Sequence, residues 1–484
     1  MRKSVTILAM LFCSIAACMA NTNDYETIKS SLNEKSLPLV NITVEIDKVN
    51  KPEYTPATIE VTDPQKRTNG EESVTFNCKV KYRGASSSGY DKKSFAVKLL
   101  NEKGKSLDAS MFGIREDDAW ILDAMAVDRI RMRNRLNFDI WNAMSQTPYN
   151  TDNANRNGTM GYFVELFING EYHGLYCFTD KVNRKLLGVK KAKENDDNSV
   201  TIKGVVYKCA SWDDSAFLKG YDEQDMNNTI WNAWELDYPD DYPCEEAYMP
   251  LKDFIDFCAK TTDTEFADGL DDNLYIKNFT DYHVFVISQG LTDNAMKNTF
   301  LSIVDKNKGK RIMITPWDLD ASLGGYWDGR HYDYNAQNST ILAVRPYKRL
   351  WDNDVNGYAD AVANRWRKFV NKGILSKEAV NERIDSYANA FIESGAWQRE
   401  YDKWNNNPVP LEQDITVETN YVKRWYSHNF DNIEGVFKEY GTTYIKDVET
   451  DNDNDGTLYN VLGQKVNHTY KGIVIKKGKK TYQM

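Results

Sequence analysis

The segment 293–325 constrains this chain more than any other stretch. Asp293 is followed five positions later by Asn298, and an apolar run over 299–304 comes next. A polar Asp-Lys-Asn-Lys-Gly sequence then gives a turn signal, and a second apolar run covers 311–315. Two apolar runs joined by such a turn predict a β-hairpin.

This hairpin is expected to gather polar side chains at its open end. The second predicted strand runs directly into a Pro-Trp-Asp-Leu-Asp sequence. Side chains two apart in an extended segment point to the same face, so Asp318 and Asp320 are expected to converge on one cation. Because a hairpin returns to its starting point, Asp293 and Asn298 are expected to lie beside Asp318.

The order of these groups matches the plan of protein kinase catalysis. Kinases place a catalytic Asp, an Asn five positions later and then a metal-binding Asp. One carboxylate orients the attacking hydroxyl, while the amide oxygen and the second carboxylate hold magnesium against the phosphates. The alternative is that Asp293 caps a helix end and the Trp-Asp-Leu-Asp run is a solvated strand end. An Asp-x4-Asn spacing is common, so spacing alone does not decide between the two.

Residues 1–20 predict an export signal. Two basic residues precede an apolar stretch over 5–17, which is too short to span a bilayer. The stretch ends in Ile-Ala-Ala-Cys, which resembles a bacterial lipoprotein cleavage site with Cys18 as the lipidated residue. The alternative is an ordinary signal peptide cut after Ala20. We therefore expect an exported protein, either a lipoprotein of the cell envelope or surface, attached to the membrane only by its N-terminal lipid, or a periplasmic or secreted protein.

The composition narrows the class of partner. The chain is 41% hydrophobic, 12% aromatic and 27% charged, which predicts a globular protein. Its net charge of −10 argues against nucleic acid as a natural partner. No Cys-x-x-Cys pair occurs and there are only five histidines, so a zinc site is not expected. The sequence does not indicate an oligomeric state.

Short alternating segments dominate the first half of the chain after a polar tether predicted over 21–36. Alternation of apolar and polar residues is typical of half-buried strands. Asn169-Gly170 predicts a two-residue hairpin turn. The predicted strands are 39–45, 57–61, 74–80, 95–99, 120–122, 162–168, 172–178 and 205–208.

Helical patterns dominate the second half. Residues 210–250 show little periodicity and are predicted to be an insertion over the surface. The predicted fold class is α+β, with an N-terminal β-rich part and a C-terminal helical part in one domain over 37–440. An acidic linker over 441–455 and a small C-terminal β module over 456–484 complete the chain. One predicted helix ends near residue 144, and another begins at residue 180. Further helices are predicted over 251–259, 278–289, 361–370, 377–394 and 414–437.

A loop of small residues joins two of the predicted strands. It runs from Arg83 to Gly89 and is followed by Lys92, Lys93 and Ser94. Free backbone N–H groups and hydroxyls, flanked by basic residues, are suited to cradling phosphate. An ordinary hairpin loop is the alternative.

Several segments together resemble the spore-coat protein H (CotH) kinase family. They occur in the family's order over 37–440, which covers nearly all of the chain after the tether. The matching segments are Arg83-Gly-Ala-Ser-Ser87 with Lys92-Lys-Ser94; Trp120-Ile-Leu122 with Asp128 and Arg133-Asn134; Tyr162 to Tyr176, with Asn169-Gly-Glu-Tyr172 at the turn; Val206-Tyr-Lys208; Asp293 with Asn298; and Pro316-Trp-Asp-Leu-Asp320.

The resemblance implies an atypical protein kinase-like fold. Such an enzyme uses ATP and Mg²⁺ (or Mn²⁺) to phosphorylate Ser or Thr on secreted or surface proteins, in the envelope or outside the cell. Carried over by position, Asp293 is the catalytic residue. Asn298 and Asp318 are the metal-binding pair, with Asp320 as the competing metal candidate.

The resemblance also suggests cofactor-binding residues. Tyr207 and Trp317 are candidate aromatic faces for adenine, with core packing as the alternative for both. Lys93 and Lys98 compete for the role of the phosphate-contacting lysine, and Arg83 belongs to the candidate phosphate loop.

Two features depart from the kinase pattern. No Gly-x-Gly-x-x-Gly loop is present, so residues 83–93 would have to cover the phosphates. Where the family often has Glu after the second strand of the 162–178 hairpin, this chain has the shorter Asp180, which puts an ion pair between that position and a lysine in doubt.

The competing hypothesis is a non-catalytic surface adhesin, or a glycan- or protein-binding module, on a kinase-like scaffold. The 12 Trp and 29 Tyr residues would suit stacking on sugars. A pure binding protein has no need of Asp293, Asn298 and Asp318 together, so their presence favours the enzyme.

Overall fold

The computed structural model describes residues 24–149, 156–197, 199–332 and 340–440, and the backbone of four short strands between 458 and 483. The predicted export signal, with Cys18, and the predicted acidic linker over 441–455 lie outside the described residues. The chain divides into two units, 1–436 and 437–484. Within the described residues, no helix has the length and apolar character needed to cross a membrane.

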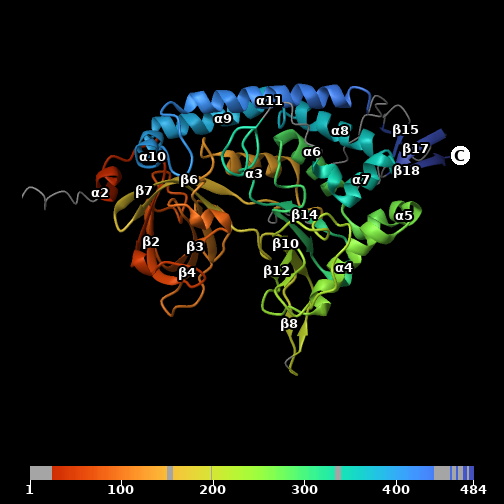
Figure 1. Ribbon diagram of the computed structural model, residues 1–484, viewed down its shortest axis with the longest axis horizontal. Helices are drawn as coiled ribbons and strands as arrows, with labels where there is room; N and C mark the ends of the chain where they lie inside the picture. Colours follow the sequence, from red (N-terminus) through yellow and green to blue (C-terminus); the bar gives the residue numbers. More distant parts are fainter. Residues whose placement is uncertain are drawn as a thin grey trace, which may run out of the picture. The chain divides into compact units, whose positions relative to one another are not determined.

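The first part of unit one is a closed β-barrel with the strand order β1-β2-β3-β4-β5-β7-β6 (Figure 1). Neighbouring strands are antiparallel, except that β1 and β6 pair in parallel and close the barrel. Alternate residues of each strand fill the interior, as Phe95, Val97 and Leu99 do from β4. The strands are β1 (Leu39–Val44), β2 (Thr55–Thr62), β3 (Ser73–Arg83), β4 (Ser94–Leu100), β5 (Ala119–Asp123), β6 (Gly161–Ile168) and β7 (Glu171–Asp180).

The turn between β6 and β7 confirms the prediction made from its sequence. Asn169 and Gly170 have φ angles of 52° and 85°. Two consecutive left-handed residues are what a tight hairpin turn requires, and Asn and Gly tolerate them best.

The predicted tether over 21–36 is wrong for its described part. Residues Asp24–Lys29 form helix α2. The side chain of Tyr25 is only 1% exposed, its hydroxyl lies 2.8 Å from Thr62 Oγ1, and its ring packs edge-on against Phe167. This buried ring, with the ion pair between Lys29 and Glu60 at 2.6 Å, fixes the polar segment to the barrel.

A second sheet follows the barrel, with the order β11-β12-β10-β13-β14. The hairpin predicted around 299–315 is confirmed, because Thr299 lies opposite Pro316 and Ser302 opposite Met313. The interpretation of 210–250 as a surface insertion is wrong, since Trp231 and Trp234 within it are fully buried. The strands are β10 (Val205–Cys209), β11 (Ile230–Trp231), β12 (Trp234–Tyr238), β13 (Thr299–Ile303) and β14 (Met313–Pro316), with a separate hairpin of β8 (Lys193–Glu194) and β9 (Val200–Thr201).

Helices cover most of the remaining chain, with α9 and α11 side by side along one edge in Figure 1. The helix predicted from residue 180 is absent: residues 181–188 form turns, because Arg115 binds the Lys181 carbonyl and the Asn183 side chain. The helices are α3 (Arg133–Met144), α4 (Glu245–Lys260), α5 (Asp263–Asn273), α6 (Ile276–Gln289), α7 (Arg345–Asp352), α8 (Tyr358–Asn371), α9 (Lys377–Glu393), α10 (Ala396–Trp404) and α11 (Ile415–Phe437).

Unit two contains an antiparallel sheet with the order β16-β15-β17-β18, in agreement with the β content predicted for 456–484. Its strands are β15 (Leu458–Asn460), β16 (Lys465–Val466), β17 (Gly472–Lys476) and β18 (Lys479–Gln483).

A fully buried ion cluster joins helix α10 to the barrel. Glu400 Oε1 accepts hydrogen bonds from Lys92 Nζ at 2.6 Å and Arg131 Nε at 2.7 Å, and Glu400 Oε2 accepts one from Leu175 N at 2.7 Å. Burial opposes ionisation of Glu400, but the Lys92 and Arg131 cations outweigh it and lower the pKa of this carboxyl. Arg131 also donates to three carbonyls of the segment 125–128, so one carboxylate stabilises three parts of the chain.

We expect Glu400→Gln to lower the free energy of unfolding by about 3–5 kcal/mol, because two buried cations lose their counter-charge. Urea unfolding followed by tryptophan fluorescence measures this. Glu393→Gln is the matched control, since Glu393 contacts Lys35 at 3.3 Å with both side chains more than half exposed; its cost should be below about 1 kcal/mol. Equal losses in the two variants would contradict this role of Glu400.

Candidate active site

A cleft of about 850 Å³ contains the predicted catalytic and metal-binding residues. Its walls come from the barrel, the segment 123–138, the region after β10, and the segment 293–320. Asp293, Asn298, Asp318 and Asp320 all line it. The structure thus brings together the four residues that the sequence places on either side of the β13–β14 hairpin.

Asp293 is held by its two downstream neighbours. Asn298 Nδ2 donates a hydrogen bond to Asp293 Oδ2 at 2.9 Å, and Lys297 Nζ lies 3.2 Å from the same oxygen. Asn298 has a left-handed φ of 59°, and its carbonyl accepts a hydrogen bond from Trp317 N at 2.8 Å. Because its amide nitrogen faces Asp293, the side-chain oxygen of Asn298 is left for another ligand.

A buried amide joins the two halves of this site. Asn294 is fully buried, and its Nδ2 donates to the carbonyl of Trp317 at 2.6 Å, with longer contacts to the carbonyls of Asn298 at 3.3 Å and Asp318 at 3.4 Å. Tyr282 donates its hydroxyl to the Asn294 carbonyl at 2.5 Å. Asn294 was not predicted to be a site residue from the sequence, although Asn294 directly follows the predicted catalytic residue.

The expected reason for the convergence of Asp318 and Asp320 is wrong. Strand β14 ends at Pro316 and Asp318 has a left-handed φ of 55°, so the two carboxylates do not lie on one face of an extended strand. They reach the cleft from a loop instead. Leu319 N between them donates to Asn134 Oδ1 at 3.1 Å, which holds this loop against the start of α3.

A further carboxylate, Asp123 at the end of β5, also lines the cleft. Asp123 Oδ2 accepts a hydrogen bond from Asn134 Nδ2 at 2.7 Å, and Asp123 Oδ1 accepts one from Met125 N at 3.1 Å. Asn134 therefore bridges Asp123 and the loop that carries Asp318. Asn134 was noted from the sequence only within the family resemblance, and Asp123 was not predicted as a site residue. The sequence signal for Asp123 is an acidic residue at the end of a buried strand.

Burial and neighbouring carboxylates raise the pKa of Asp318 and Asp320 in the cleft. Desolvation, followed by repulsion from Asp123, raises the pKa of Asp318. Desolvation and then the nearby Asp318 and Asp123 raise the pKa of Asp320 well above its ordinary value. Within the described residues, neither Asp318 nor Asp320 has a side-chain hydrogen bond or an ion pair. Converging carboxylates without a protein cation, next to the free amide oxygen of Asn298, fit the oxygen donor set of Mg²⁺ or Mn²⁺.

The cleft also carries candidate groups for nucleotide binding. The Arg83 guanidinium lies 5.5 Å from the ring centroid of Trp317, and both residues line the cleft. After Arg83 the chain turns through Gly84, whose φ is 106° and where a Cβ atom would lie 2.0 Å from Ser87 Oγ. Glycine is required there, so the small-residue loop has a defined shape and continues into a short 3₁₀ turn over Ser86–Gly89.

Tyr207 does not have the position expected of an adenine-binding residue. Its side chain is fully buried, its hydroxyl donates to the Ala247 carbonyl at 2.5 Å, and its ring stacks on Tyr248. The core-packing alternative therefore holds for Tyr207. Trp317 is the remaining aromatic candidate.

Neither lysine proposed for phosphate contact lines the cleft. Lys93 Nζ donates to the carbonyls of Ser88 and Tyr90, and Lys98 lies over the ring of Tyr54 on the outside of the barrel. Lys98 points away from the site because residues alternate along β4, whereas Lys93 precedes this strand and is held by the Ser88 and Tyr90 carbonyls. The cationic residues that line the cleft are Lys51, Lys81, Arg83, Lys92, Arg135, Lys208 and Lys297.

Asp180, which stands where the family often has Glu, contacts an arginine and not a lysine. Arg115 Nε lies 3.0 Å from Asp180 Oδ2, and Met160 N donates to Asp180 Oδ1 at 2.8 Å. The buried lysine with a carboxylate partner is Lys92, and that partner is Glu400.

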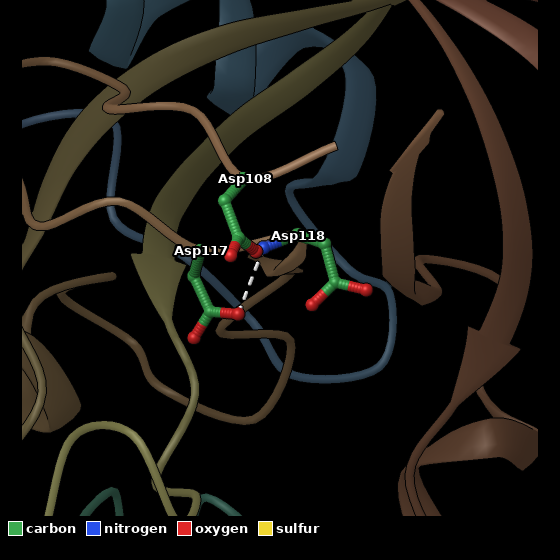
Figure 2. A group of neighbouring side chains, drawn as sticks. All are labelled: Asp108, Asp117 and Asp118. Atoms are coloured by element: carbon green, nitrogen blue, oxygen red, sulfur yellow. Dashed lines mark hydrogen bonds between the residues drawn. The ribbon is translucent and has the colours of Figure 1, made fainter. Parts of the chain in front are cut away.

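A second acidic cluster lies outside the cleft. Asp108, Asp117 and Asp118 present oxygens within 4.8 Å of one another (Figure 2). Lys185 Nζ already lies 2.5, 3.5 and 3.8 Å from these three carboxylates, and Arg115 contacts Asp117 at 2.6 Å. Protein cations balance this cluster, in contrast to Asp318 and Asp320 in the cleft.

A model of the CotH kinase protein family matches residues 80–432, which include every residue assigned to the cleft from Lys81 onward. This chain belongs to the CotH kinase family. No curated protein gives a significant match to it. Membership of this family suggests an atypical kinase, and the mixed helix and sheet content of the structure is consistent with the predicted α+β class.

The raised pKa of Asp320 predicts that its carboxylate destabilises the metal-free protein. A carboxyl whose folded pKa lies above its unfolded value binds more protons when folded, so the cost is absent below the unfolded pKa and develops as the pH rises from the unfolded to the folded pKa. In EDTA at pH 7, Asp320→Asn should therefore raise the thermal midpoint, and this gain should shrink near pH 4. Thermal unfolding with and without Mg²⁺ also tests whether the variant loses a metal-dependent shift.

Asp268→Asn is the control, because Asp268 is exposed on α5; it should change neither the EDTA midpoint nor the response to Mg²⁺. A lower midpoint for Asp320→Asn in EDTA at pH 7 would show that the Asp320 carboxylate is already stabilised by the protein.

Proposed function

We propose that this protein is an atypical kinase of the CotH type that uses ATP with Mg²⁺ or Mn²⁺ and transfers the γ-phosphate to Ser or Thr of exported or surface proteins. The observation that best supports the proposal is that Asp293 and Asp318 line the same cleft, where Asn298 donates a hydrogen bond to Asp293. The barrel followed by a mainly helical part is compatible with the kinase-like fold that the family implies.

In this proposal Asp293 orients the acceptor hydroxyl and receives its proton. Lys297 and Asn298 both contact Asp293 Oδ2, which leaves Oδ1 for the substrate. Asn298 Oδ1, Asp318 and Asp320 would hold the divalent cation, which supplies charge neutralisation of the phosphates when bound. Trp317 offers an aromatic face for adenine, and Arg83 offers a cation beside it.

The location and the acceptor belong to the same proposal. We infer export from the sequence of residues 1–20, with Cys18 as the lipid attachment point; a mature N-terminus at Asn21 would contradict lipidation. The acceptor would then be a protein of the envelope or one outside the cell. The converging carboxylates favour this enzyme over a non-catalytic adhesin, because a binding surface gains nothing from mutually repelling charges.

Substituting the two central aspartates should separate transfer from nucleotide binding. We expect Asp293→Asn to bind Mg-ATP about as well as the wild type but to transfer phosphate about 10²–10⁴-fold more slowly, because it removes a proton-accepting group and keeps its shape. Asp318→Asn should weaken metal-dependent nucleotide binding and transfer together. Transfer of labelled phosphate to the protein itself and to a Ser/Thr-rich acceptor measures the rates, and thermal shift measures the binding.

Asp328→Asn is a suitable control, since Asp328 pairs with Arg330 at 2.6 Å and does not line the cleft. Wild-type transfer by Asp293→Asn would show that Asp293 has no catalytic role.

A further inference from the structure

Two exposed tryptophans line the same cleft as Asp293. Trp212 is 41% exposed and Trp327 is 52% exposed, and both belong to the cleft lining. Exposed indoles are costly unless they contact a partner, because each buries a large apolar surface when it is covered. No part of the chemistry proposed above uses them.

Trp212 is placed close to the catalytic residues by the backbone. Asn298 N donates to the Cys209 carbonyl at 3.1 Å, and Trp212 follows three residues later with its ring 5.3 Å from that of Phe217. The indole therefore lies on the part of the wall that also holds Asn298 and, through it, Asp293.

Trp327 is carried by a firmly held hairpin that follows Asp320. Gly325 and His331 form the bridge of this hairpin. Arg129 Nε donates to the Gly329 carbonyl at 2.7 Å, and His331 Nε2 lies 2.9 Å from Glu418 Oε2. Because the hairpin is fixed at several points, the exposure of Trp327 is a feature of a rigid wall.

The charges next to the indoles are only partly paired within the protein. Beside Trp212, Lys208 lies 3.7 Å from Glu235. Beside Trp327, Arg330 lies 2.6 Å from Asp328. Asp213 and Asp214 directly follow Trp212 and form no ion pair among the described residues, but neither of them lines the cleft. The two indoles do line it, so apolar contact is expected to select what binds there.

We propose that Trp212 and Trp327 bind the acceptor polypeptide next to its Ser or Thr and select a large apolar or aromatic residue within a few positions of the acceptor hydroxyl. This inference rests on the proposed kinase function and adds the acceptor class to it. Both indoles line the cleft that contains Asp293, and indole faces bind large apolar side chains and proline rings well.

Phosphorylation of an oriented peptide library tests the proposal. Each peptide carries one Ser, and the flanking positions are varied over apolar, aromatic, acidic and basic residues. The wild type should prefer a large apolar or aromatic residue at one or more flanking positions. Trp212→Ala and Trp327→Ala should each weaken that preference and raise the KM for the preferred peptide about tenfold, with a much smaller change in kcat and an unchanged thermal shift by Mg-ATP.

Conservative variants and a remote control separate binding from folding. Trp212→Phe and Trp327→Phe should restore most of the preference. Ile230→Ala should leave it unchanged, because Ile230 is 55% exposed but does not line the cleft. A library preference for charged flanking residues, wild-type KM values in both Ala variants, or transfer to carbohydrate instead of peptide would overturn the inference while the kinase proposal stands. Absence of Mg-ATP binding by the wild type would overturn both.

Discussion

Repulsion between carboxylates is the physical constraint on which the centre of this molecule depends. Asp318 and Asp320 share the cleft with Asp123 and Asp293, and desolvation together with repulsion from these neighbours raises the pKa of both residues. Like charges are costly at such sites unless a cation or a proton balances them. The proposed cation would supply that balance in the cleft, whereas Lys185 already balances the acidic cluster at Asp108.

Neutral amide side chains hold the repelling groups in place. Asn134 joins Asp123 to the Leu319 backbone, Asn294 joins the segment after Asp293 to the Trp317 carbonyl, and Asn298 contacts Asp293 directly. An amide donates hydrogen bonds without a charge, so it positions a carboxylate without neutralising it. A lysine or arginine could not replace Asn134, because neither has an acceptor for the Leu319 N–H, and its positive charge would reduce the repulsion between the carboxylates.

Much of the fold was predictable because it depends on local patterns. Alternating apolar and polar segments predicted the seven barrel strands, and two apolar runs with a polar turn between them predicted the β13–β14 hairpin. The errors came where tertiary contacts override local signals. Tyr25 turns a polar segment into a docked helix, and Arg115 binds backbone and side-chain oxygens in the segment where a helix was expected.

The candidate site was predictable in its residues but not in its geometry. Spacing in the chain placed Asp293, Asn298, Asp318 and Asp320 together, yet the left-handed φ of Asp318 has no reliable sequence signal. Tyr207 illustrates the same limit, because proximity in the chain says nothing about which way a buried ring points. Asp123 lies on a strand 170 residues before Asp293 in the sequence. The partner of Lys92 is Glu400, which is 308 positions away. Only the closed barrel and its contact with α10 bring such groups together.

Nucleotide binding by the wild-type protein, measured with and without a divalent cation, tests the central claim most directly. If the repelling carboxylates exist to hold a metal ion against phosphates, ATP should raise the thermal midpoint only when Mg²⁺ or Mn²⁺ is present. The stabilisation should approach about 2.7 kcal/mol at a hundredfold excess of ATP over its dissociation constant. An unchanged midpoint at millimolar ATP and Mg²⁺, or an equal shift in EDTA, would contradict the account.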